Sequence, residues 1–166
     1  ILEAEKAWKG ETQVDNILLT APTGSGKSLL FQLPAIYLGK EYNLLTIVVS
    51  PLKALIVDQV ESLQELGYMR VAYASSDLSP EQKMEVYRQV REGEIDLFYL
   101  SPELLLSYDI KHFVGERRIG LVVVDEAHTV TTWGKEFRVD YWFLGRYLTA
   151  LKQTLGYNFP LFALTA

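Results

Sequence analysis

Apolar residues run through this chain in short continuous stretches that alternate with longer segments of mixed apolar and polar positions. Continuous apolar runs of about four to eight residues, rich in β-branched side chains, are typical of strands buried on both faces. We predict strands at residues 16–20, 44–50, 69–74, 95–100, 119–124 and 161–165.

Helical patterns follow most of these runs. One begins at Leu29, and a second is predicted to open at Pro51 and to stop at Gly67. The apolar stripe of the second helix is expected to be Leu52, Leu55, Ile56, Val60, Leu63 and Leu66. A capping box at residues 79–82 predicts a helix to about residue 91, and another is predicted at 140–154. This alternation predicts an α/β fold, with a mainly parallel sheet and helices on both faces.

The turn between the first strand and the first helix reads Ala-Pro-Thr-Gly-Ser-Gly-Lys-Ser over residues 21–28. Gly24 and Gly26 allow the backbone to curl so that successive N–H groups face one concavity, which binds phosphate oxygens. Lys27 adds positive charge for the β- and γ-phosphates, and the Ser28 hydroxyl can ligate Mg²⁺. The predicted nucleotide-phosphate site comprises Thr23, Gly24, Ser25, Gly26, Lys27 and Ser28. It is a variant loop, with Ala21 where the commonest form has glycine.

An acidic sequence, Asp125-Glu126-Ala127-His128, follows the apolar strand at residues 119–124. The carboxyl ends of strands are where open α/β sheets bind ligands. We therefore expect Asp125 to hold Mg²⁺ and Glu126 to polarise the attacking water. The alternative is a surface turn of solvated charge, which the buried strand and the phosphate loop disfavour.

Composition sets broad limits on the class of protein. The 166 residues are 49% hydrophobic, enough for one substantial core, and contain no cysteine, which excludes disulfides. No apolar stretch reaches the ~18 residues that span a bilayer, and the first residues lack the order of a secretory signal. A net charge of −5 argues against a large nucleic-acid footprint, although backbone N–H groups can still contact phosphates. The chain lacks an initiating Met and stops inside an apolar run, so we expect a single domain over residues 1–166 of a longer protein.

These motifs together resemble a known family. Residues 21–28 and 125–128 resemble the ATPase core of superfamily 2 DEAH-box helicases. Residues 49–59 and 100–103 are similar to motifs Ia and Ib of the RecQ DNA helicases, and the aromatic stretch at residues 133–141 resembles their aromatic-rich loop. The resemblance covers nearly the whole chain and corresponds to the first, N-terminal, of two RecA-like lobes.

The resemblance implies an ATP-dependent DNA helicase or translocase that uses ATP and Mg²⁺ and moves on single-stranded or forked DNA. It further implies a second lobe in the same parent chain that supplies arginine fingers, so that this lobe alone would hydrolyse ATP negligibly. DNA repair and a cytoplasmic or nuclear location, with no membrane association, belong to the same expectation. His128, placed with the catalytic residues Lys27, Asp125 and Glu126, is expected to link the nucleotide site to Thr165 by a hydrogen bond.

The resemblance also places a nucleic-acid site. The expected contacts are Pro51, Leu52, Ser101, Pro102, Trp133, Phe137 and Arg138. Helices that open at Ser50-Pro51 and Ser101-Pro102 offer free N–H groups to phosphates, while the same serines are expected to cap those helices. The aromatic residues could stack on bases, or could be core residues under a loop.

Two other functions remain open at this stage. One is an RNA helicase, or a restriction or repair translocase, with the same core. The other is a non-catalytic scaffold lobe, which the presence of Lys27, Asp125 and Glu126 disfavours.

Overall fold

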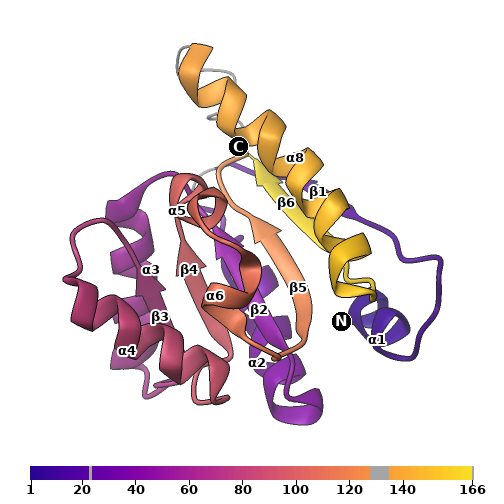
Figure 1. Cartoon of the computed structure of the whole chain (residues 1–166), viewed down its shortest axis with the longest axis horizontal. Helices are drawn as coiled ribbons and strands as arrows, with labels where there is room; N and C mark the ends of the chain where they lie inside the picture. The colour runs from indigo at the N-terminus through magenta and orange to yellow at the C-terminus, as the bar shows by residue number, and fades with distance from the viewer. Residues whose placement is uncertain (23, 128–134, 166) are drawn as a thin grey trace.

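The structure, a computed structural model, describes the backbone of residues 1–22, 24–127 and 135–165, and the side chains of these residues except 135–143. Within these ranges six strands form one parallel sheet in the order β1-β6-β5-β2-β4-β3 (Figure 1). The strands are β1 (Ile17–Thr20), β2 (Leu45–Val49), β3 (Val71–Ala74), β4 (Leu97–Leu100), β5 (Ile119–Val124) and β6 (Leu161–Thr165). The predicted strands and the parallel sheet are confirmed.

Helices cover both faces of the sheet, as Figure 1 shows. One face packs against α1 (Leu2–Trp8), α2 (Leu29–Tyr42) and α3 (Lys53–Glu65). The other packs against α4 (Pro80–Arg91), α5 (Pro102–Ser107), α6 (Ile110–Val114) and α8 (Lys135–Leu155). Because both faces are covered, the central strands β2 and β4 are buried at every position, which explains their uninterrupted apolar sequences.

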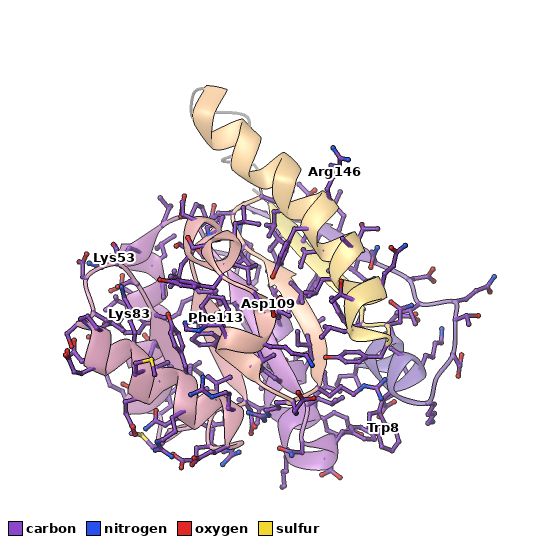
Figure 2. All side chains as sticks on the ribbon, viewed as in Figure 1. Trp8, Lys53, Lys83, Asp109, Phe113 and Arg146 are labelled. Atoms are coloured by element: carbon purple, nitrogen blue, oxygen red, sulfur yellow. The ribbon has the colours of Figure 1, made fainter. Side chains whose placement is uncertain are left out.

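Alternate residues of the strands enter two separate cores. On β4, Phe98 and Leu100 face the core under α4 and α6, while Leu97 and Tyr99 face the core under α2 and α3. Phe113 of α6 points into the first of these layers, where its ring lies 5.1 Å from that of Tyr87 (Figure 2). The fold therefore rests on two hydrophobic layers, one on each side of the sheet.

The boundaries of two helices, α3 and α8, differ from the sequence predictions. Helix α3 begins at Lys53 with Leu52 as its N-cap, so Pro51 precedes the helix instead of opening it. Leu66, which was predicted to belong to the apolar stripe of this helix, is 83% exposed, because the helix ends at Glu65 and the chain turns at Gly67. Helix α8 begins at Lys135, five residues earlier than predicted.

Some helices begin where their local sequence predicts, and other helices have no recognisable local sequence signal. The capping box of α4 is present: the Gln82 N–H donates to Ser79 Oγ at 3.1 Å, and the Ser79 N–H donates to Gln82 Oε1 at 2.8 Å. Helix α5 begins at Pro102, as expected for a helix that opens at Ser101-Pro102. Helices α1 and α6 were not predicted. They have 7 and 5 residues, and helices this short depend on tertiary packing more than on local propensity. In the part of the chain that the structure describes, no helix is long and apolar enough to cross a membrane.

Candidate active site

The phosphate loop and the acidic sequence meet at the carboxyl edge of the sheet, on either side of β6. The Ala21 N–H, just after β1, donates to the carbonyl oxygen of Thr165 at 3.0 Å. The Ala127 N–H, just after β5, donates to the carbonyl oxygen of Leu164 at 2.8 Å. One strand end thus holds both candidate loops, which puts the site at the position where parallel α/β sheets bind ligands.

The phosphate loop has the backbone that its glycines were expected to allow. Gly24 and Gly26 have φ angles of +82° and +74°, in the left-handed region that side chains with a Cβ rarely adopt. Lys27 is only 9% exposed, and its Nζ donates to the carbonyl oxygen of Ala21 at 3.3 Å. Ser28 is the N-cap of α2, so the loop leads directly into the N-terminus of a helix of 14 residues. Thr23 lies outside the described residues.

Asp125 is buried at the end of β5, with only 4% of its surface exposed. Its Oδ1 accepts a hydrogen bond of 2.9 Å from the Glu126 N–H, and its Oδ2 accepts one of 3.3 Å from Gln59 Nε2. Burial raises the pKa of Asp125, while these hydrogen bonds and the positive charge of Lys27 act to lower it.

Glu126 has an unusual backbone conformation. Its φ angle is +53°, a left-handed value that is uncommon for a residue with a side chain. Such conformations cost about 1–3 kcal/mol and cluster at functional sites. The Glu126 side chain is half-buried, whereas the preceding Asp125 is buried.

The two predicted nucleic-acid segments also lie at this edge. The Ser50 N–H donates to the carbonyl oxygen of Leu100 at 3.1 Å, so the segments after β2 and β4 are neighbours. Ser101 caps α5 as predicted, accepting from the Leu104 N–H at 3.3 Å, and Pro102 is buried at the first helical position. The predicted capping by Ser50 is wrong, since Ser50 is buried two residues before the N-cap of α3.

The remaining predicted residues are described in part or not at all. Phe137 and Arg138 lie on α8 and not in a loop, and their side chains are outside the described set. His128 and Trp133 lie outside the described residues.

Sequence reasoning missed three polar residues that are linked to the site through hydrogen bonds. Gln32 of α2, Tyr99 of β4 and Gln59 of α3 form a chain of hydrogen bonds that ends on Asp125. Gln59 was noted only as part of the motif Ia resemblance. Gln32 and Tyr99 stand among apolar residues in their elements, and nothing in a single sequence separates them from ordinary packing positions.

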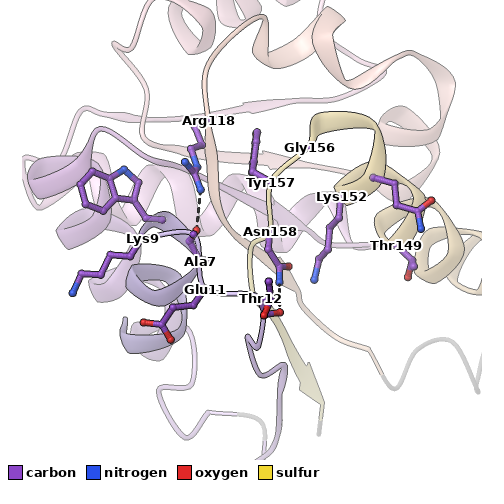
Figure 3. A pocket seen from close by; sticks show the side chains of 13 residues that line it. Ala7, Lys9, Glu11, Thr12, Arg118, Thr149, Lys152, Gly156, Tyr157 and Asn158 are labelled. Carbon is purple, nitrogen blue, oxygen red and sulfur yellow. Dashed lines mark hydrogen bonds between the residues drawn. The ribbon is translucent and has the colours of Figure 1, made fainter.

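A hollow of about 690 Å³ lies at the opposite, amino edge of the sheet (Figure 3). It is lined by α1, the start of β5 and the C-terminal end of α8, including Arg118, Lys152 and Tyr157. The Arg118 guanidinium stacks over the Tyr157 ring at 4.8 Å and donates to the carbonyl oxygen of Ala7 at 3.0 Å. Because the hollow lies at the amino edge of the sheet, it is separate from the phosphate loop and from the acidic end of β5, which lie at the carboxyl edge.

Comparisons with known proteins agree with this geometry. The DEAD/DEAH box helicase family matches residues 4–163. The ATP-dependent DNA helicase RecQ of Synechocystis is 42% identical over 154 residues, which cover 90% of this chain and 30% of the relative. The ATP-dependent helicase SGS1 of Saccharomyces cerevisiae is 35% identical over 159 residues, covering 93% of this chain and 11% of the relative. The resemblance to RecQ helicases is thereby confirmed.

Solved structures of helicases share the fold. The DUF1998 helicase MrfA bound to DNA and AMPPNP superposes with a TM-score of 0.70 at 22% identity, covering 99% of this chain and 23% of that one. The Hef helicase domain of Pyrococcus furiosus gives a TM-score of 0.65 at 23% identity, covering 91% of this chain and 30% of that one. The chain spans less than a third of the length of each of these relatives and structures. By its match over residues 4–163, the chain belongs to the DEAD/DEAH box helicase family.

Proposed function

We propose that this chain is the N-terminal, nucleotide-binding lobe of an ATP-dependent DNA helicase of RecQ type. The observation that carries the proposal is the meeting of the phosphate loop and the acidic end of β5 at one edge of the sheet, with β6 holding both. RecQ DNA helicases among the relatives support DNA as the nucleic acid along which the protein moves. A second RecA-like lobe in the same parent chain is proposed to complete the site, in keeping with the small share of each relative that this chain spans.

The donors at the site fit a magnesium ion that is held mainly by nucleotide. Within residues 1–22, 24–127 and 135–165, no group of three or more His, Cys, Asp or Glu side chains could hold a metal. Ser28 and Asp125 instead offer two hard oxygen donors, which suits Mg²⁺ because it keeps several waters and phosphate ligands. When bound, this ion neutralises charge on the β- and γ-phosphates.

In this proposal each residue has a separate task. The loop at Thr23, Gly24, Ser25 and Gly26 surrounds the phosphates with N–H groups, and Lys27 adds charge that favours the transferred phosphoryl group. Glu126 accepts a proton from the attacking water. His128 links the nucleotide site to the end of β6. Single-stranded DNA contacts Pro51, Leu52, Ser101 and Pro102 through its phosphates and contacts Trp133, Phe137 and Arg138 beyond the acidic sequence.

The test is Glu126→Gln in the full-length protein. ATP binding should stay within about threefold of wild type, while DNA-stimulated hydrolysis should fall by about 10²- to 10⁴-fold, the usual contribution of a general base. Glu61→Gln, at an exposed position on α3, is the matched control and should leave both quantities unchanged. Unchanged hydrolysis in Glu126→Gln would remove Glu126 from this role.

A second arm tests the nucleic acid. Hydrolysis by the wild-type protein is measured with single-stranded DNA and with RNA of the same sequence. Greater stimulation by DNA is expected. Stimulation by RNA alone would favour an RNA helicase with the same core, and the absence of any Mg²⁺-dependent nucleotide binding would favour a scaffold.

A further inference from the structure

A partly buried chain of hydrogen bonds joins three structural elements to Asp125. Gln32 Nε2 on α2 donates to the Tyr99 hydroxyl at 3.2 Å. The Tyr99 hydroxyl on β4 donates to Gln59 Oε1 on α3 at 2.8 Å. Gln59 Nε2 then donates to Asp125 Oδ2 at 3.3 Å. The chain begins on the helix that follows the phosphate loop and ends on the acidic sequence.

The donors in this chain all run in one direction. The Tyr99 hydroxyl has one proton, and the Gln32 amide already donates to its oxygen, so that proton goes to the carbonyl oxygen of Gln59. The amide of Gln59 is therefore oriented with its NH₂ group toward Asp125. With the amide turned over, its oxygen would face a carboxylate oxygen, which is repulsive. Tyr99 and the Asp125 carboxylate thus favour the same orientation of the Gln59 amide.

Because these polar groups are buried, losing one hydrogen bond of the chain would leave a buried donor or acceptor unpaired, which costs free energy. Tyr99 is fully buried, Gln32 is 6% exposed and Asp125 is 4% exposed. The Tyr99 ring packs within the core of α2 and α3, with the Phe31 ring 6.4 Å away. Burial raises the pKa of Tyr99 and keeps its hydroxyl protonated as a donor. A phenylalanine would fill the same apolar space without a buried hydroxyl, so packing alone does not explain the tyrosine.

We infer that Tyr99, Gln59 and Gln32 are positioning residues that hold the Asp125 carboxylate in one orientation before nucleotide and magnesium arrive. Oδ2 is held by Gln59 and Oδ1 by the Glu126 N–H, so both oxygens are constrained from different sides. Hydrogen bonds to a metal-binding carboxylate typically change metal affinity or activity by about 10- to 100-fold. The inference rests on the proposed function, in which Asp125 is the metal-side carboxylate.

The experiment measures how much magnesium the full-length protein needs to bind nucleotide. Fluorescence of mant-ADP is titrated with MgCl₂ for wild type, Tyr99→Phe and Gln59→Leu, and mant-ADP affinity is also measured in EDTA. The Mg²⁺ concentration at half-effect should rise about tenfold in Tyr99→Phe and at least as much in Gln59→Leu. Affinity in EDTA should stay within about twofold, because the phosphate loop is unchanged.

Tyr87→Phe is the matched control. Tyr87 is also buried, on the other face of the sheet, and its hydroxyl makes no hydrogen bond with the described residues. Removing the Tyr87 hydroxyl should leave the Mg²⁺ concentration at half-effect unchanged. An effect in Tyr87→Phe as large as that in Tyr99→Phe would overturn the inference, because it would show a general response to lost hydroxyl groups.

The outcomes separate this inference from the proposed function. If the mant-ADP affinity of the wild-type protein does not depend on Mg²⁺, both the positioning role and the proposed function are overturned. A wild type that responds to Mg²⁺, together with folded Tyr99→Phe and Gln59→Leu variants that respond identically, would overturn the positioning role alone. Equal weakening with and without Mg²⁺ would also overturn it, since that indicates damage to the fold. If Tyr99→Phe does not fold, the half-buried Gln59→Leu variant decides the question.

Discussion

Two aspartates are buried at opposite edges of the sheet, and they are held in different ways. Asp96 precedes β4 at the amino edge and is 2% exposed. It forms ion pairs with the buried Arg117 and with Arg70, whose Nε lies 2.6 Å from Oδ2. Asp125 follows β5 at the carboxyl edge, where the amide of Gln59 and the N–H of Glu126 donate to it.

The different partners of Asp96 and Asp125 indicate which of the two carboxylates stabilises the fold. At Asp96, guanidinium groups bring opposite charge and hydrogen bonds together, so the desolvation cost is offset within the protein. At Asp125, burial outweighs the favourable contacts and the pKa is raised, so the carboxylate is disfavoured in the folded state. We therefore expect the first aspartate to control stability and the second to control hydrolysis.

The largest expected effect is on stability, from Asp96→Asn. This change leaves the Arg117 side chain, which is 4% exposed, without its ionic partner. Removing one member of a buried pair costs about 3–5 kcal/mol of unfolding free energy. Urea denaturation measures the loss. ATP hydrolysis per folded molecule should be unchanged at low temperature, and a loss below about 1 kcal/mol would contradict the contrast.

Asp125→Asn should give the opposite pattern. Hydrolysis should fall by at least about 100-fold, equivalent to ~2.7 kcal/mol of transition-state stabilisation. The unfolding free energy without nucleotide should change by less than about 1 kcal/mol. The amide removes the cost of burying a charge, but its NH₂ group loses one of the two hydrogen bonds that the carboxylate accepts. Steady-state kinetics and urea denaturation of the same preparation measure the two effects. Destabilisation as large as that of Asp96→Asn would contradict the assignment.

Gly39→Ala tests how tightly the Asp96 cluster is packed. A Cβ at Gly39 of α2 would lie 2.5 Å from the Asp96 Cγ, and that carboxylate is held by two arginines. We expect a loss of about 1–3 kcal/mol from overpacking, measured by urea denaturation. Gly145→Ala, on α8 with nothing within 4 Å of the added Cβ, should instead stabilise by about 0.5–1 kcal/mol. If the two variants behave alike, helix propensity and not the cluster decides the outcome.

Asp77→Asn should have the smallest effect. Asp77 pairs with Lys53 on the surface, where the two side chains are 62% and 47% exposed. An exposed ion pair contributes about 0.2–1 kcal/mol at most, and salt screens it. The loss, measured by thermal unfolding, should disappear in about 0.5 M NaCl. A loss comparable to that of Asp96→Asn would show that burial does not distinguish the two ion pairs.

The sequence by itself determined the strands, the phosphate loop and the capped start of α4. These features are local: a continuous apolar run makes a buried strand, Gly24 and Gly26 permit a left-handed backbone, and residues 79–82 hydrogen-bond to one another. A pattern within a few residues is enough to specify each of them.

Only the tertiary structure decided where α3 begins, that Leu66 is exposed, and which partners hold Asp96 and Asp125. Gln59 and Asp125 are 66 residues apart in the chain, and Gln32 and Tyr99 are 67 apart. Arg117 and Asp96 are likewise brought together from different elements, 21 residues apart. No local pattern records such pairs, because they form only once strand order and helix packing have brought distant residues to the same edge of the sheet.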